Sequence, residues 1–366
     1  MIRSLTTTAL VGACFAAATS QAAEVTFSGS VDAGTLITLD TLADAPFYDH
    51  NLEANLTADI KLSDAVSAQL YGAALAGAVP TGVPADNGRW PGFAFDGATI
   101  TWKVGEDMTL VFGDVVIGKG SIGYYALKRY TSGARTQAVQ GVSLSSGGFT
   151  GYVGNPDIRQ DVTAFGASYM ATLSEGMTLE PFADVTTGIS KELPWTAGAQ
   201  FKGGFGPLAL AATGSVFGAD GGDGKHAIAF ASVVEPNLTF GAFTWANTLV
   251  YAPKAEANGK GEYPVYSFPI RHGRSYDAIE QDLIVYTEPG YTISDVVATG
   301  LAFEYLEDDL SEEKTETMLI TPNLYLYPAE GASITLYAGA AVPTSETDGE
   351  ADPTTFYAGM ETIFKF

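Results

Sequence analysis

One stretch of this chain alternates apolar and polar side chains without an error, and this alternation restricts the fold more than any other feature. Between residues 52 and 62 every even position is apolar and every odd position is polar or charged. Successive side chains of a β-strand point to opposite faces of the sheet, so the stretch predicts a strand with one apolar and one polar face. A helix is excluded, because its apolar positions recur every three or four residues.

The last thirteen residues follow the same alternation, with Ile363 out of step. Phe364 and Phe366 end an apolar row at even positions, whereas Glu361 and Lys365 stand in the odd row. Further alternating runs cover residues 24–33, 177–186, 195–202 and 333–342. The chain is therefore predicted to be all-β.

Tight connections alternate with long ones along the chain, and both kinds hold turn-forming residues. The tight connections are Ser63-Asp64, Gly105-Glu106-Asp107, Ser145-Ser146-Gly147-Gly148, Ser174-Glu175-Gly176, Gly203-Gly204-Phe205-Gly206, Glu235-Pro236-Asn237, Glu288-Pro289-Gly290 and Ala329-Glu330-Gly331-Ala332. Long ones include residues 77–93, 114–137, 254–276 and 344–353. Eight tight turns, with both chain ends at one rim, predict 18 antiparallel strands.

The apolar rows favour a closed barrel in a membrane over a soluble sandwich. A sandwich would need a second sheet to cover each apolar face. In lipid an open sheet edge is not tolerated, so the sheet must close on itself. The sequence therefore predicts a closed antiparallel transmembrane β-barrel of 16–18 strands, in which short turns occupy one rim and long loops the other.

The first 22 residues have the features of a secretory signal peptide. Arg3 gives a positive start, residues 9–18 are an apolar run, and Ser20-Gln21-Ala22 has the small-x-small cleavage pattern. We therefore expect residues 1–22 to be cleaved and residues 23–366 to form a single barrel domain. Cys14 resembles a lipoprotein cleavage cysteine only faintly, and its loss with the signal would leave no thiol.

The chain is strongly acidic, with a formal net charge of -24, which becomes -25 when Arg3 is removed. Such a surface argues against nucleic acid as a partner. Enzymatic activity is not expected either, because none of His50, His226 and His272 neighbours a serine-centred motif. A closed barrel that acts as an adhesin or scaffold stays open as an alternative.

The ending Phe364-Lys365-Phe366 resembles the closing strand of the α-proteobacterial (Rhodobacter-type) general porins. The signal segment, the first strand and the run Leu110-Val111-Phe112-Gly113-Asp114 resemble that family as well. The resemblance implies a water-filled channel in the bacterial outer membrane for passive diffusion of small hydrophilic solutes and ions, or a substrate-selective channel. It also implies a homotrimer, contacts with lipid and lipopolysaccharide, and a terminal Phe that the barrel-assembly machinery reads. The family normally has 16 strands.

In that family the loop after the fifth strand folds into the barrel and narrows it. Residues 114–137 match it in position and length, so the resemblance implies a constriction loop here. The charges differ from the family pattern, because this segment carries Lys119, Lys128, Arg129 and Arg135 and only one acid, Asp114. A surface loop tied to acidic neighbours or to lipopolysaccharide is the alternative.

The predicted inward wall has the opposite charge balance. Its charged residues are Asp32, Glu53, Asp59, Lys61, Lys103, Glu180, Asp184, Lys202 and Glu304. Opposite charges facing each other across a narrow opening sort solutes by charge. We therefore expect a transverse field whose polarity is reversed relative to the family.

Acidic clusters in the predicted outer loops are weak candidates for calcium, which prefers several oxygen ligands. The candidate ligands are Asp308, Asp309, Asp348 and Asp352. None of them stands in an ordered loop motif, so solvated charge is the favoured interpretation. No cofactor is expected.

Overall fold

The computed structural model describes residues 24–40, 47–77, 92–116, 119–120, 126–127, 138–155, 162–187, 195–220, 226–251, 266–267, 283–308, 315–343, 346–347, 350–351 and 354–366. Every regular element within these ranges is a β-strand. No helix in this part of the chain is long and apolar enough to cross a membrane.

One large sheet contains most of the strands, and two small sheets contain the rest. The strands of the large sheet are β1 (Glu24–Asp40), β2 (Phe47–Lys61), β3 (Val66–Gly77), β4 (Gly92–Val104), β5 (Met108–Val116), β8 (Ala138–Ser146), β9 (Phe149–Asn155), β10 (Thr163–Tyr169), β11 (Ala171–Ser174), β12 (Met177–Thr187), β13 (Trp195–Phe205), β14 (Leu208–Asp220), β15 (His226–Phe240), β16 (Phe243–Tyr251), β18 (Leu283–Ser294), β19 (Val297–Asp308), β20 (Thr315–Ala329), β21 (Ala332–Pro343) and β24 (Thr355–Lys365). The small sheets comprise β6 (Lys119–Gly120), β7 (Ala126–Leu127) and β17 (Tyr266–Ser267), and β22 (Glu346–Thr347) with β23 (Glu350–Ala351).

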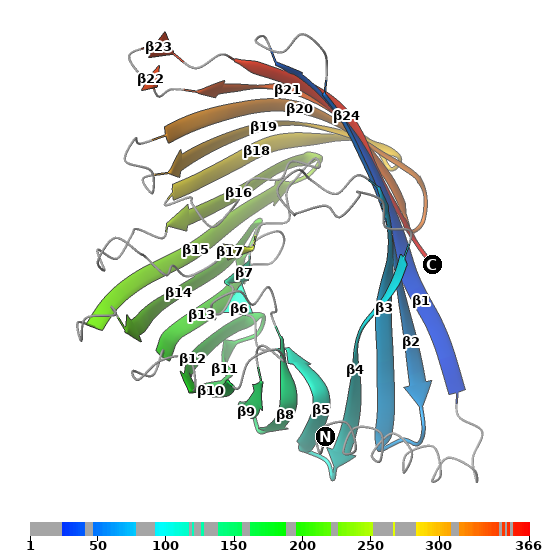
Figure 1. Cartoon of the computed structure of the whole chain (residues 1–366), viewed down its shortest axis with the longest axis vertical. Helices are drawn as coiled ribbons and strands as arrows, with labels where there is room; N and C mark the ends of the chain where they lie inside the picture. Colours follow the sequence, from blue (N-terminus) through cyan, green and yellow to red (C-terminus); the bar gives the residue numbers. More distant parts are fainter. Residues whose placement is uncertain are drawn as a thin grey trace.

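The large sheet closes on itself. Each of its strands except β10 pairs antiparallel with the next one along the chain, and β1 pairs with both β2 and β24. In Figure 1 the sheet curves round until β24 (red) lies beside β1 (blue). Strands β10 and β11 both pair with β12 and are two halves of one stave, so the 19-stranded sheet is an 18-stave barrel. The predicted closed barrel is confirmed, with 18 strands rather than 16.

The two faces of the barrel wall differ as the alternation predicts. Leu324, Leu336 and Met360 lie side by side on β20, β21 and β24, and they are 37%, 38% and 41% exposed. The residues that alternate with them, such as Tyr337 and Tyr357, are buried. Side chains on the concave face of a closed barrel converge and shield one another, so the buried row faces the lumen. The exposed apolar row therefore covers the outside of the barrel.

The lumen-facing row also contains the buried polar residues, which distinguishes the barrel from a soluble protein with an apolar interior. The buried polar side chains on this row include Ser143, Ser168, Thr186, Thr196, Gln200, Thr213, Ser215, Glu235, Thr248, Glu288, Thr321 and Asn323. Hydrogen bonds satisfy several of them, for example the bond from Gln200 Nε2 to Thr213 Oγ1 at 3.2 Å. The barrel is thus apolar outside and largely polar inside.

Six of the eight predicted tight turns lie where the sequence places them, and two predictions are wrong. Glu235-Pro236-Asn237 lies inside β15, and Glu288-Pro289-Gly290 lies inside β18. The chain turns after these strands instead, at residues 241–242, where Gly241 has a φ of 59°, and at residues 295–296. Pro followed by Asn or Gly is turn chemistry, but here each proline is a strand residue on the outer face.

Four prolines lie well inside strands, and each interrupts the ladder on one side only. Pro236 and Pro322 keep their register with β14 and β19 but coincide with gaps in the pairing to β16 and β21. Pro289 keeps its register with β16 but coincides with a gap in the pairing to β19. Pro181 lies opposite the break between β10 and β11. A proline has no N–H to donate, so one ladder bond is missing at each site. Since Pro181 and Pro322 stand within runs that the sequence predicts as strands, an interrupted ladder is expected at both, and the register confirms it.

The two ends of the chain close the barrel. Gly29 and Phe366 exchange two backbone hydrogen bonds, of 3.0 and 3.1 Å. A Cβ at position 29 would lie 2.3 Å from the Asn55 carbonyl oxygen and 2.8 Å from the Phe366 ring. Only glycine therefore fits under the terminal aromatic ring at this seam.

Candidate functional site in the barrel lumen

The charged residues that the sequence assigns to the pore wall do lie on the lumen-facing row. The strand register places Asp32, Asp59, Lys61, Lys103, Glu180, Asp184, Lys202 and Glu304 there. Glu53 pairs with Asp32 across β1 and β2, so it belongs to the same row, although its side chain lies outside the described residues. Their position is thus observed, whereas their role in solute passage stays a prediction.

Four further acids and one lysine on this row were not assigned to the pore wall from the sequence, and one of the acids is the exposed Glu24 at the start of β1. Glu235 and Glu288 are 2% and 6% exposed, and Glu361 is half-buried beside the seam, near the exposed Lys365. Glu235 and Glu288 were missed because their Glu-Pro dipeptides resemble turns. A usable signal was present, since Glu-Pro recurs at Glu180-Pro181, where the alternation is clear.

Glu288 is the best-bonded carboxylate of the wall. It accepts hydrogen bonds from the hydroxyls of Tyr286 and Tyr325 and, at 3.1 Å, from Asn323 Nδ2. Its carboxylate covers Gly300 of β19, where a Cβ would lie 2.1 Å from Oε1. Donors from β18 and β20 thus hold a negative charge at a fixed place in a crowded part of the lumen.

The described inward lysines are confined to one end of the wall, whereas inward acids occur at that end and further along the strands. The described inward lysines, Lys61, Lys103, Lys202 and Lys365, are exposed and stand close to the tight-turn rim. The inward acids further from this rim, such as Asp184, Glu235 and Glu304, are buried or half-buried. The described interior is therefore negative at depth, and fixed negative charge in a confined lumen favours cations.

Asp114 lies in the barrel wall at the end of the fifth strand. Its Oδ2 accepts hydrogen bonds from the Tyr71 hydroxyl at 2.8 Å and from the Ala98 N–H at 2.9 Å. Gly113, with a φ of 104°, makes the turn into this position, and Gly97 leaves room for the carboxylate. The pairing of β4 and β5 ends at Thr99 and Gly113, and the Asp114 carboxylate then serves as the acceptor for the next N–H group of β4, that of Ala98.

The connection after β5 contributes β6 and β7, which pair with each other and, through β7, with β17. Strand β6 contacts β14, which is six staves further round the wall, and Figure 1 shows the short strands inside the curve of the large sheet. Where β5 ends, Val115, Val139 and Ala164 form a buried apolar patch on the inward row. Lys119 belongs to β6, but its side chain is not among the described parts of the structure. Lys128, Arg129 and Arg135 lie outside the described residues altogether.

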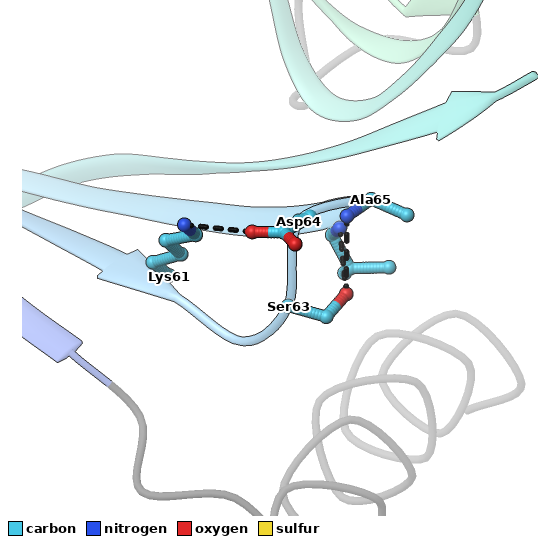
Figure 2. Close-up of polar contacts among 5 residues, drawn as sticks. Lys61, Ser63, Asp64 and Ala65 are labelled. Atoms are coloured by element: carbon cyan, nitrogen blue, oxygen red, sulfur yellow. Dashed lines mark hydrogen bonds and ion pairs between the residues drawn. The ribbon is translucent and has the colours of Figure 1, made fainter.

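A cavity of about 470 Å³ opens on the lumen wall at the tight-turn rim of β1–β4. At its edge the Lys61 ammonium lies 2.8 Å from the Asp64 carboxylate, and the Ser63 hydroxyl accepts backbone N–H bonds from Ala65 and Val66 (Figure 2). The hydrogen bond from Lys61 and its positive charge lower the pKa of Asp64 below its ordinary value. The turn therefore presents a fixed pair of opposite charges to the cavity.

The remaining predicted sites are placed only in part. Phe364 and Phe366 of the predicted assembly signal lie on the outer face and are exposed. Of the calcium candidates, Asp308 ends β19 with its side chain undescribed, and Asp309, Asp348 and Asp352 lie outside the described residues. Within the described ranges no group of three acidic, His or Cys side chains could hold a metal ion.

The structure thus defines a closed 18-stave antiparallel barrel with an apolar exterior and a charged, largely polar lumen. No family model and no curated protein sequence matches this chain. Similar solved structures include the outer membrane protein opdK from Pseudomonas aeruginosa, with a TM-score of 0.59 at 10% identity over 93% of this chain and 98% of that one. OccAB4 of Acinetobacter baumannii gives 0.57 at 11% identity over 94% and 98%. The anion-selective porin from Comamonas acidovorans gives 0.53 at 10% identity over 94% and 100%. At such identities the likeness establishes the fold alone.

Proposed function

We propose that this chain is an outer-membrane porin, a water-filled channel for passive diffusion of small hydrophilic solutes and ions. The observation that carries the proposal is the inversion of the wall, in which exposed apolar side chains cover the outside and charged side chains line the inside. An apolar exterior is stable only against lipid, and barrels of 16–18 strands are wide enough for an aqueous channel. The fold shared with outer-membrane proteins supports the same location.

The finer part of the proposal is a cation-preferring lumen with a basic constriction. The buried and half-buried acids of the wall attract cations, and residues 114–137 place Lys128, Arg129 and Arg135 in the segment that follows β5. The contact of β6 with β14 and the apolar patch at the end of β5 support an inward course for that segment. The basic residues then oppose cations at the narrowest point.

Conductance and reversal potential in a planar bilayer test both parts. We expect stable open channels with modest cation preference at low salt, which shrinks or reverses as salt rises and the screening length falls below about 10 Å. Neutral residues in place of Lys128, Arg129 and Arg135 should raise conductance and shift selectivity further towards cations at every salt concentration.

The matched control replaces the loop acids Asp308, Asp309 and Asp348, which should change selectivity only at low salt. If the triple basic variant leaves reversal potentials unchanged, the constriction is not in this segment. A protein that inserts without conducting would be a closed barrel, and the adhesin or scaffold function would then replace the porin. If solutes of only one chemical class block the ionic current, the protein is a substrate-selective channel.

We further propose membership of the α-proteobacterial general porins, a homotrimer, and contacts with lipopolysaccharide and the barrel-assembly machinery. These rest on the resemblance of the Phe364-Lys365-Phe366 ending and of the passage at residues 110–114. The same resemblance supports cleavage of residues 1–22 during export. N-terminal sequencing and the mass of the purified oligomer test these points directly.

A further inference from the structure

The rim cavity is lined by two successive rungs of the barrel ladder. The first rung consists of Glu24, Lys61, Ser67 and Thr101, and the second of Thr26, Asp59, Gln69 and Thr99, on β1, β2, β3 and β4 in that order. All eight belong to the lumen-facing row. Lys103 of β4 and Asp64 of the turn complete the polar lining nearer the rim. Regular strands therefore build most of the described lining, and the turn between β2 and β3 forms its edge.

The charges of this cavity alternate in sign and are partly fixed in place. Lys61 is held by Asp64 at 2.8 Å, and Asp59 accepts a hydrogen bond from Gln69 Nε2 at 2.9 Å. The side chains of the two outer charges, Glu24 and Lys103, make no hydrogen bond or ion pair within the described part of the chain, although Glu24 acts electrostatically on Lys61 and Lys103 on Asp64. They stand on β1 and β4, three inter-strand spacings apart, which is roughly 14 Å along the wall.

The chemistry of the lining selects among ligand classes. An anion would face three carboxylates, and a simple cation would face two ammonium groups. A sugar usually stacks on an aromatic face, and none of the described residues that line the cavity is aromatic. A solute with separate positive and negative ends meets complementary charge at both ends.

We propose that this cavity is a binding subsite for small zwitterionic solutes whose charges are several ångströms apart, such as ω-amino acids. The carboxylate of the solute binds at Lys103, and its ammonium group binds at Glu24. The volume of about 470 Å³ lies within the range of small-molecule sites. The inference rests on the proposed channel function, because the solute reaches this rim through the lumen.

Calorimetric titration of the full barrel in detergent micelles with 5-aminopentanoate tests the subsite. We expect saturable binding that pentanoate and pentylamine, which each carry one charge, do not reproduce. Glu24→Gln and Lys103→Gln should each weaken binding by roughly threefold to tenfold, as expected for exposed charge pairs. Lys365→Gln removes an inward rim lysine outside the cavity and should leave binding unchanged.

Several outcomes would overturn the proposal. These are the absence of binding to the folded barrel, equal binding of a singly charged analogue, and equal weakening by Lys365→Gln and Lys103→Gln. Planar-bilayer recordings with the same variants separate this failure from failure of the channel function. A conducting barrel without zwitterion binding refutes the subsite alone, whereas a barrel that does not conduct refutes the channel.

Discussion

Two neighbouring residues of β21 provide a sharp test of which face of the wall meets lipid. Leu336 lies on the outer face between Leu324 and Met360, and Thr335 lies on the inner face between Tyr325 and Glu361. Leu336 is five residues from Gly331 of the turn, which puts it about 17 Å along the strand and, at a tilt of roughly 40°, about 13 Å above the rim. This height is the middle of an apolar band of about 25 Å.

Leu336→Arg should therefore place a cation near the bilayer midplane, at a cost of about 3 kcal/mol. This corresponds to roughly two orders of magnitude in the ratio of folded to unfolded protein. Thr335→Arg places the same side chain in the lumen, close to Glu361, and should change the unfolding free energy by less than about 1 kcal/mol. Equilibrium urea unfolding in phospholipid vesicles, followed by tryptophan fluorescence, measures both changes.

The comparison is internally controlled, because both variants add one arginine to the same strand. A soluble barrel or sandwich would show the reverse order, since its exposed face would accept Arg at position 336 and its interior would reject Arg at position 335. If Leu336→Arg is as stable as the wild type, or if Thr335→Arg is the more destabilising, the assignment of the two faces is refuted.

Three further predictions concern single side chains. Glu288→Leu should destabilise the barrel by about 2–5 kcal/mol, because two buried donors and one half-buried donor lose their acceptor. Urea unfolding with the exposed turn variant Glu330→Gln as control checks this, and equal stabilities would contradict it. Deletion of Phe366 should leave unassembled protein in the periplasm but weaken folding into detergent only slightly. Its ring is 66% exposed, and full burial of such a ring is worth only about 1–3 kcal/mol. Normal surface levels of the deletion variant would argue against an assembly role. The pKa of Asp64 should lie below 3.8, so its pairing with Lys61 is complete above that pH and is lost as pH falls through the lowered pKa. An NMR titration of the carboxyl should show the pKa of Asp64 rising towards 3.8 in Lys61→Gln. An unchanged titration midpoint would show that Lys61 does not lower this pKa.

The architecture was predictable because the information that specifies it is local. The alternation at residues 52–62 and at the C-terminal strand assigns each side chain to a face, and lipid then requires the sheet to close. The strand number could also be predicted, although two turns were misplaced by several residues. Each misplaced turn still joins the same two strands, so an error in turn position does not change the count.

The lumen wall was predictable where alternation is clean and not where proline disturbs it. Glu180 and Asp184 of β12 follow directly from their position in the alternating row. Glu235 and Glu288 were hidden because each precedes a proline in a sequence that is typical of a turn. The bond from Tyr71 to Asp114 joins residues 43 positions apart, and it depends on strand register that no local pattern contains.

The prolines inside the strands have a consequence for how the barrel assembles. Before its neighbour arrives, each strand presents a row of free N–H and C=O groups, and such an edge can pair with a strand of another molecule. Pro236, Pro289 and Pro322 each lack a donor on the edge that awaits the next strand along the chain. An incoming strand from another copy therefore finds a broken template, whereas the correct partner is tethered by a short turn and tolerates one missing bond. These three prolines, which interrupt the finished wall, thereby protect the unfinished one from pairing between molecules.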